Sequence, residues 1–188
     1  MKKYIIQSVR LTAVLLVLLC VIYPLFIMLI GRFTKGEGGG EKIMKDGKVV
    51  GYAAIGQSFT KPEYFWSRPS AVDYKADGSG GSNKGPSNPE YLKQVADRID
   101  TVLKYNPTVK RADIPADLVT ASGSGLDPNI SEQAAKIQIS RIATIRKLDE
   151  SKLKDLIAKN TEKPFLGLFG PSKINVLKLN VALDELGK

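Results

Sequence analysis

Residues 11–30 form an uninterrupted apolar run in which only Thr12 and Tyr23 carry a polar group. As an α-helix, a run of this length extends about 30 Å, the thickness of a bilayer's hydrocarbon core. A cleaved signal peptide has a shorter apolar region of about 7–15 residues and a small-residue cleavage site, and the sequence has neither. We therefore predict an uncleaved transmembrane helix over residues 11–31, with Pro24 as a point where it bends.

The predicted helix separates a short basic tail from a long C-terminal segment. Residues 1–10 contain Lys2, Lys3 and Arg10, and such a tail normally stays in the cytoplasm while a long following domain crosses the membrane. Residues 32–42 are rich in glycine and charge, which is typical of a flexible tether. We expect a single-pass protein of the inner (plasma) membrane, with residues 1–10 cytoplasmic and residues 43–188 forming an extracytoplasmic domain.

The remaining chain predicts one compact α+β domain of short strands and about three helices. Apolar residues broken by glycines over residues 48–59 indicate short strands joined by tight turns. Three helices are predicted because a capping residue precedes apolar residues at helical spacing; the caps are Asn88, Ser131 and Asp149. Residues 174–181 are predicted as a strand, followed by a closing helical turn that Asn180 caps.

The composition excludes most catalytic chemistry. The chain has no histidine, and its one cysteine, Cys20, lies in the predicted span, so Ser-His triads, Cys-His dyads and imidazole metal sites are absent. The formal charge is +9, but no basic cluster is interleaved with aromatic residues, so no nucleic-acid partner is expected. We expect no catalytic residue, no metal site and no firmly bound cofactor.

Two Ser-x-x-Lys matches leave a second hypothesis open, a membrane-anchored exported Ser-Lys hydrolase. They are Ser58 with Lys61 and Ser151 with Lys154. Neither is accompanied by the Ser-Asp-Asn or Lys-Thr-Gly elements that complete such sites. Ser151 also falls in the first turn of a predicted helix, so we rank this hypothesis below a non-catalytic role.

Two turn-rich polar stretches, residues 79–89 and 117–128, each run directly into a predicted helix. Neither contains the phosphate-binding Gly-x-x-x-x-Gly-Lys-Ser/Thr pattern, and residues 123–125 lack the third glycine of a dinucleotide fingerprint. Backbone amides in such loops can still bind an anion, so an exported anion- or nucleotide-binding module is a third hypothesis. We interpret the stretches first as one surface shaped to meet another protein. The predicted partner-facing residues are Gly85, Asn88, Ser122, Gly123, Ser124, Gly125 and Asp127.

A series of motifs gives the chain a specific resemblance. In order along nearly the whole sequence they are YPL (23–25), IGQSF (55–59), YFWSRPSA (64–71), SGGSN (79–83), SNP (87–89), LVTASGSGLD (118–127) and NVLKLNVALD (175–184). Together with the single N-terminal span, these motifs resemble the KdpC family, the accessory component of the Kdp potassium-transporting ATPase.

The resemblance implies a non-catalytic accessory subunit of a high-affinity potassium uptake pump. Its partners would be the channel-like component KdpA, the P-type ATPase component KdpB, the small component KdpF and membrane lipid, with potassium as the transported ion. The family is also described as a catalytic chaperone that raises the ATP affinity of KdpB. If ATP contacts this chain, the resemblance points to Ser79, Gly80, Gly81 and Ser82. Histidine is common in the family at the positions of Asn129 and Asn160, so any role of those histidines does not carry over.

Overall fold

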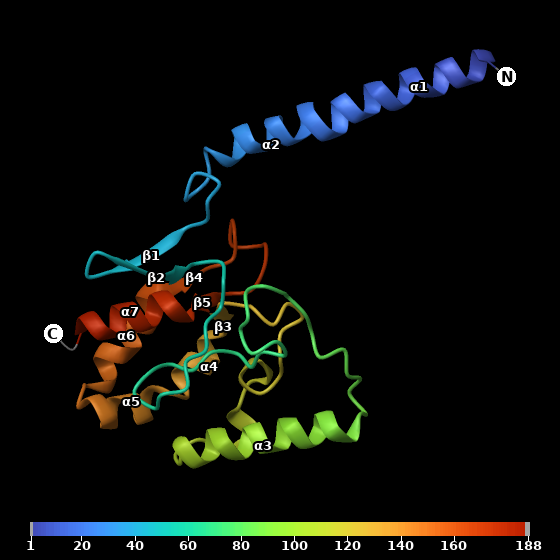
Figure 1. Cartoon of the computed structure of the whole chain (residues 1–188). Helices are drawn as coiled ribbons and strands as arrows, with labels where there is room; N and C mark the ends of the chain where they lie inside the picture. The colour runs from blue at the N-terminus through green and yellow to red at the C-terminus, as the bar shows by residue number, and fades with distance from the viewer. Residues whose placement is uncertain (1, 187–188) are drawn as a thin grey trace. The chain divides into compact units, whose positions relative to one another are not determined.

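The computed structural model describes residues 2–186, which form two compact units, one ending at Lys42 and the other starting at Ile43 (Figure 1). The first unit is mainly one continuous helix, made of α1 (Lys2–Val17), a π-helical turn (Leu18–Ile22) and α2 (Tyr23–Gly31). Among the described helices, only this one, Tyr4–Gly31, is long and apolar enough to cross a membrane, and an 18-residue window within it has a mean hydropathy of 3.1. By length and composition, the predicted N-terminal apolar helix is confirmed.

A π-helical turn, Leu18–Ile22, lies directly before Pro24, where we predicted a bend. Proline has no N–H, and its ring clashes with the carbonyl four residues earlier in a regular helix. Here the Tyr23 N–H donates to the carbonyl of Leu18, five residues before it, so the turn preceding the proline is widened. The helix therefore continues past the proline to Gly31.

A two-stranded hairpin of β1 (Lys42–Lys45) and β2 (Lys48–Tyr52) lies at the start of the second unit, and only its first residue, Lys42, belongs to the first. Asp46 (φ 49°) and Gly47 (φ 75°) form its turn, and two consecutive positive φ angles are typical of the tight Asp-Gly hairpin turn. The region predicted to hold short strands thus contains β2. The partner strand β1 was not predicted, and it starts on the last residue of the predicted tether.

A second, three-stranded sheet is antiparallel, with the order β3-β5-β4. Its strands are β3 (Asn129–Ile130), β4 (Thr161–Glu162) and β5 (Lys173–Asn175). The central strand β5 places Ile174 opposite both Ile130 and Thr161. Ile174 is fully buried, so this small sheet brings three distant parts of the chain onto the core.

Five α-helices accompany the sheets in the described part of the second unit: α3 (Pro89–Tyr105), α4 (Glu132–Lys136), α5 (Ile139–Arg146), α6 (Glu150–Asn160) and α7 (Val176–Leu186). The three predicted caps each accept a hydrogen bond from a backbone N–H, Asn88 from Tyr91, Ser131 from Ala134 and Asp149 from Ser151. Two 3₁₀ turns, Arg111–Asp113 and Ala116–Leu118, lie in the connection after α3. The α+β class is confirmed, with more helices than predicted.

The helix predicted to start at Ser131 is divided into α4 and α5 at residues 137–138. Gln138 stands at the division, and its side chain is buried, with 1% of its surface exposed. Its Oε1 accepts a hydrogen bond from the Trp66 N–H at 2.8 Å, and its Nε2 donates to the Ala134 carbonyl at 3.0 Å. The division between α4 and α5 therefore lies at a residue whose side chain hydrogen-bonds to the backbone of Trp66.

The strand predicted over residues 174–181 was wrong beyond Asn175. Val176 begins α7, and Asn175 is its N-terminal cap because its side chain accepts from the Lys178 N–H at 3.1 Å. The buried positions Val176, Leu179 and Leu183 follow helical spacing. The run of branched apolar residues favoured a strand, and the predicted cap Asn180 lies inside the helix.

Asn180 instead holds an extended segment against the core. Its Oδ1 accepts from the Phe65 N–H, and its Nδ2 donates to the Phe65 carbonyl, both at 2.9 Å. Phe65 is fully buried and Asn180 is 2% exposed. The side chain therefore satisfies both backbone groups of Phe65, as a neighbouring strand would do in a sheet. The other large, fully buried apolar residues of the core are Ile142, Leu153, Ile157, Ile174, Leu179 and Leu183.

A buried arginine supports the same segment. Arg141 is 6% exposed, its guanidinium lies 4.0 Å from the centre of the Trp66 ring, and its Nη2 donates to the Tyr64 carbonyl at 3.0 Å. Burial lowers the pKa of Arg141 to about 10, so the guanidinium keeps its charge at neutral pH. A cation over an aromatic ring is an arrangement that partly replaces lost hydration.

A second ionic cluster joins the first hairpin to the last helix. Asp184 of α7 accepts from Lys45 of β1, from Arg146 Nη2 at 2.7 Å and from the Tyr64 hydroxyl at 3.1 Å. The Asp184 side chain is 15% exposed. Burial by itself raises the pKa of Asp184, but the three donors outweigh it and hold the pKa below the usual range of a carboxyl.

Replacing Asn180 with alanine is expected to destabilise the second unit by about 3 kcal/mol, because the buried N–H and carbonyl of Phe65 lose their partners. Urea unfolding of the full chain in detergent, followed by fluorescence of Trp66, the only tryptophan, measures this loss. Glu185→Ala, at an exposed position of the same helix, is the control and should change stability by less than about 0.5 kcal/mol. Equal effects of the two variants would contradict the role of Asn180.

The lowered pKa of Asp184 predicts a pH-dependent contribution to stability. The contribution is present above the unfolded-state pKa of about 3.9 and is lost as the pH falls through the lower folded-state value. Asp184→Asn should therefore be less stable than the parent protein at pH 7, and the difference should shrink on acidification. The same urea assay at a series of pH values tests this. Asp97→Asn, which removes only an exposed ion pair with Lys93, should show little difference at any pH.

Candidate functional site

The two turn-rich stretches of the sequence meet in the structure. The Gly80 N–H donates to the Ser124 carbonyl at 2.8 Å, and a Cβ atom built on Gly81 would lie 3.1 Å from the Gly123 carbonyl oxygen. The stretches thus form one surface feature, called here the paired loops and made of residues 79–85 and 120–128. Their close approach depends on glycine, because a side chain at Gly81 would crowd the opposite backbone.

Gly125 is the most constrained position in the paired loops. Its φ is +68°, and a Cβ atom there would lie 2.6 Å from Val72 Cγ2 and 2.7 Å from the Gly80 carbonyl oxygen. Its N–H donates to Ser122 Oγ at 2.9 Å, and its carbonyl accepts from Ser70 Oγ at 2.6 Å. Only glycine fits this backbone conformation and this space without rearrangement.

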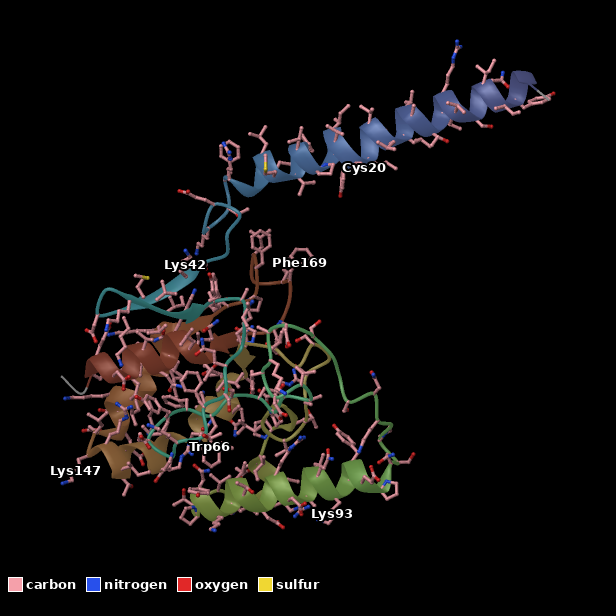
Figure 2. The ribbon with its side chains drawn as sticks, in the orientation of Figure 1. Cys20, Lys42, Trp66, Lys93, Lys147 and Phe169 are labelled. Atoms are coloured by element: carbon pink, nitrogen blue, oxygen red, sulfur yellow. The ribbon has the colours of Figure 1, made fainter. Side chains whose placement is uncertain are left out.

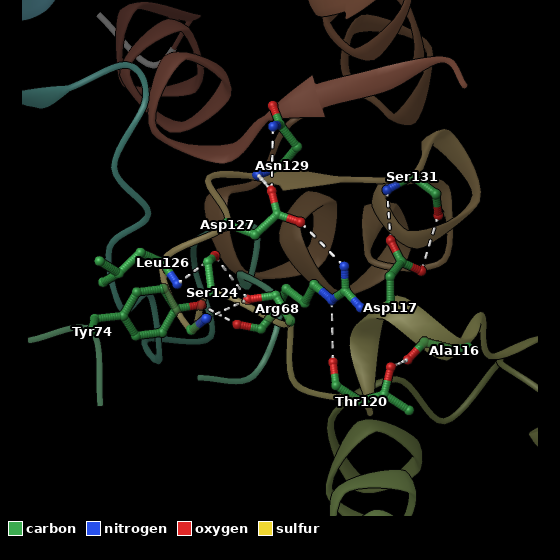
Figure 3. A network of polar contacts seen from close by, with 12 residues as sticks. Arg68, Tyr74, Ala116, Asp117, Thr120, Ser124, Leu126, Asp127, Asn129 and Ser131 are labelled. Carbon is green, nitrogen blue, oxygen red and sulfur yellow. Dashed lines mark hydrogen bonds and ion pairs between the residues drawn. The ribbon is translucent and has the colours of Figure 1, made fainter. Parts of the chain in front are cut away.

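Arg68 and Asp127 hold the paired loops from the inner side, as Figure 3 shows. Arg68 Nη1 lies 3.1 Å from Asp127 Oδ2, and Arg68 Nε donates to the Thr120 carbonyl at 3.3 Å. The other Asp127 oxygen accepts from the backbone and side-chain amides of Asn129 at 3.0 and 3.3 Å. The carboxylate of Asp127 is therefore occupied by contacts within the domain.

The segment around Gly56 also packs against the loop of residues 120–128. The Gly56 N–H donates to the Leu126 carbonyl at 2.8 Å, and a Cβ atom on Gly56 would lie 2.6 Å from the Asp127 carbonyl oxygen. Asp117, in the 3₁₀ turn that precedes the second loop, accepts from the Ser131 N–H at 2.6 Å and so joins this turn to the cap of α4 (Figure 3). The paired loops are thus fixed at several points of their inner side.

The predicted partner-facing residues divide by exposure. Gly85, Gly123 and Ser124 are exposed, and a Cβ atom on Gly85 or Gly123 would meet nothing within 4 Å. Ser122 and Gly125 are buried, whereas Asn88 and Asp127 are half-buried and use their side chains inside the domain. Whether any of the seven faces a partner stays a prediction.

An open polar cleft of about 420 Å³ lies beside the paired loops. It is lined by Ser70, Ala71, Gly81, Ser82, Lys84, Tyr91, Gln94, Arg98 and Ala121. Of the residues predicted for nucleotide, Gly81 and Ser82 line it, while Ser79 and Gly80 do not. Lys84 is paired with Glu90 at 2.8 Å, and Arg98 Nη1 donates to the Val119 carbonyl at 3.0 Å.

Sequence reasoning did not anticipate the two cations of this cleft. Arg98 comes from the middle of α3 and Lys84 from the first loop, and only the folded chain brings them to one cleft. The cleft has the charge to receive an anion or an acidic side chain. The described residues contain no group of three or more histidine, cysteine, aspartate or glutamate side chains that could hold a metal ion.

The Ser-Lys matches do not form a recognisable site. Ser58 lines a pocket of about 260 Å³ with Arg68 and Tyr74, and Lys61 is not among its lining residues. Ser151 lies exposed in the first turn of α6, where its N–H donates to Asp149. The hydrolase hypothesis gains no support from this placement.

Asn129 and Asn160, where the resemblance leads us to expect histidine in relatives, have local structural contacts. Asn129 donates to Asp127 within the inner network, and Asn160 Nδ2 donates to the Leu156 carbonyl at 2.9 Å, at the end of α6. Both side chains therefore take part in shaping backbone, and neither can titrate near neutral pH as histidine does.

Comparison with known proteins agrees over almost the full chain. The family model described as K+-transporting ATPase, c chain (KdpC), matches residues 5–185. A relative from Flavobacterium psychrophilum is 56% identical over 184 residues, covering 98% of this chain and 99% of its own length. Relatives from Flavobacterium johnsoniae (55% over 184 residues, 98% of this chain and 99% of the relative) and Bacillus cereus (46% over 191 residues, 100% and 99%) are also similar. All three are named potassium-transporting ATPase KdpC subunit. The chain therefore belongs to the KdpC family, the c chain of the K+-transporting ATPase.

Proposed function

We propose that this chain is a non-catalytic accessory subunit that assembles or stabilises the potassium pump with the channel-like KdpA, the P-type ATPase KdpB and the small KdpF. The observation that carries the proposal is the construction of the paired loops. Their inner side is fixed by Arg68, Asp127 and Gly125, while Gly85 and Gly123 leave open backbone on the outer side. A surface that is fixed from its inner side and has open backbone at Gly85 and Gly123 suits close docking of another protein, because little conformational entropy is lost on binding.

The proposed orientation places residues 1–10 in the cytoplasm and the second unit outside the inner membrane. It is supported by Lys2, Lys3 and Arg10 in the short N-terminal tail and by the length of the domain that follows the span. In this orientation the paired loops would meet parts of the pump that face the external medium, and the apolar helix would pack among the membrane helices of its partners.

The finer role expected from the family, raising the ATP affinity of KdpB, depends on this orientation. With the domain outside, a bilayer separates it from cytoplasmic ATP, so an effect on ATP affinity would be transmitted through the other pump components. With the domain inside, the cleft that contains Gly81, Ser82, Lys84 and Arg98 would be the candidate contact for nucleotide phosphates. We favour the first arrangement.

Gly123→Leu is expected to weaken co-purification with the other pump components at least about tenfold, a loss of roughly 1.4 kcal/mol in binding. The new side chain would project from the outer side of the paired loops, where a Cβ atom meets nothing within the chain. The domain itself should unfold at the same urea concentration as the parent. Pull-down of the membrane complex and potassium uptake at low external potassium measure the effect.

Two further variants separate docking from folding. Gly125→Leu should destabilise the domain itself, because the position combines a positive φ with contacts below 3 Å. Lys152→Leu, exposed on α6, should affect neither assembly nor stability. Normal assembly of the pump and normal potassium uptake with Gly123→Leu would contradict the proposed docking surface.

Cysteine labelling can determine on which side of the membrane the second unit lies. With Cys20→Ser as background, Gly78→Cys adds one thiol at an exposed position with open space around it. A membrane-impermeant maleimide should label this thiol in cells whose outer barrier has been removed but whose inner membrane is intact. Labelling that requires permeabilisation of the inner membrane would instead place the domain in the cytoplasm and restore direct contact with ATP.

A further inference from the structure

The loop between β4 and β5 exposes four large apolar side chains on the surface of the second unit. Phe165, Leu166, Leu168 and Phe169 are 72%, 74%, 81% and 64% exposed. In Figure 1 the loop projects away from the helices of the domain, and Figure 2 shows Phe169 near its tip. So many large apolar groups on one short loop form a patch that soluble surfaces normally avoid.

The loop is built so that these side chains point outward together. The Phe165 and Phe169 backbones exchange two hydrogen bonds at 2.9 Å, and their rings lie 6.5 Å apart. Leu166 (φ 53°) and Gly167 (φ 72°) form the turn at the tip. A positive φ is unfavourable for leucine, and turns of this type normally use asparagine or glycine. The unfavourable backbone conformation of Leu166 is not offset by burial of its side chain within the domain, because that side chain is exposed.

Basic residues flank the apolar tip. Lys163 and Lys173 are both exposed, and the neighbouring carboxylate, Glu162, lies 3.6 Å from the Lys173 ammonium group. Aromatic and aliphatic side chains at a tip with lysines at its base match the boundary between acyl chains and anionic headgroups. A loop that is exposed only to water does not normally carry several large apolar side chains flanked by lysines.

A bilayer is within reach of this loop. Ten residues, 32–41, lie between the end of the apolar helix at Gly31 and the start of β1 at Lys42. Fully extended, they span at most about 35 Å. The membrane that holds the helix is therefore an apolar phase available to the domain on whichever side of the bilayer the domain lies.

We propose that loop 163–173 is a second membrane attachment, which inserts Phe165, Leu166, Leu168 and Phe169 into the lipid interface while Lys163 and Lys173 contact anionic headgroups. Insertion at this depth buries the apolar tip and leaves the ammonium groups among phosphates. The attachment adds to the transmembrane helix and is independent of the paired loops and of the orientation of the chain.

The test places an environment-sensitive fluorophore on the loop of the full-length chain. In a Cys20→Ser background, Leu168→Cys is labelled with a nitrobenzoxadiazole probe and reconstituted into vesicles of phosphatidylethanolamine and phosphatidylglycerol. Nitroxide-labelled phospholipids, with the nitroxide near the headgroup end of the acyl chain, should quench this probe several-fold more than the same probe at Gly78→Cys. Lys163→Gln combined with Lys173→Gln should reduce the quenching at position 168 and leave position 78 unchanged.

Two results would overturn the proposal. One is equal quenching of the probes at positions 168 and 78. The other is a blue shift at position 168 that arises only when the other pump components are present and without quenching by nitroxide lipid, which would assign the loop to a protein contact. The substitution at position 168 lies on an exposed turn, so urea unfolding followed through Trp66 should match the parent protein.

Discussion

An extended segment without a strand partner, residues 64–68, organises the second unit. Asn180 of α7 binds both backbone groups of Phe65, and Gln138, at the division between α4 and α5, accepts from the Trp66 N–H. Two residues further on, Arg68 reaches Asp127 in the paired loops. Because a buried backbone group without a partner is costly, the two amide side chains are needed to keep this segment against the apolar core. The segment thus links the last helix, the middle helices and the surface loops.

This arrangement gives the paired loops two different sides. On the inner side, Gly125, Ser122 and Asp127 are committed to contacts with the domain, and any larger residue at Gly125 would strike Val72 and the Gly80 backbone. On the outer side, a Cβ atom added to Gly123 would meet nothing within 4 Å. The glycines of one motif therefore serve opposite purposes, since some allow the loop to fold and others leave backbone accessible. Sequence alone treats them as equivalent, because it reports composition and spacing but not which way a loop faces.

Local signals predicted what depends on local chemistry. The apolar run predicted the helix that ends at Gly31. The caps Asn88, Ser131 and Asp149 start helices as expected. Prediction failed where tertiary contacts override propensity. The branched residues after Asn175 favour a strand but form a helix, because helical spacing buries Val176, Leu179 and Leu183 on one face. The cleft with Lys84 and Arg98 could not be predicted, since its residues come from separate elements and share no motif.

The absence of histidine also has a consequence for a protein that is proposed to act by docking. Histidine is the only side chain whose ordinary pKa places its charge change between pH 5 and 8. Two charged residues with many contacts in the domain titrate outside this range. The pKa of Asp184 is held below the usual range of a carboxyl by its three donors, and burial lowers the pKa of Arg141 only to about 10, so it stays cationic. The ionic contacts around Asp184 and Arg141 therefore keep the same charge across that interval. For a domain proposed to face the external medium, where pH varies more than in the cytoplasm, a framework of this kind keeps the paired loops in one geometry, so that assembly depends on fit rather than on protonation.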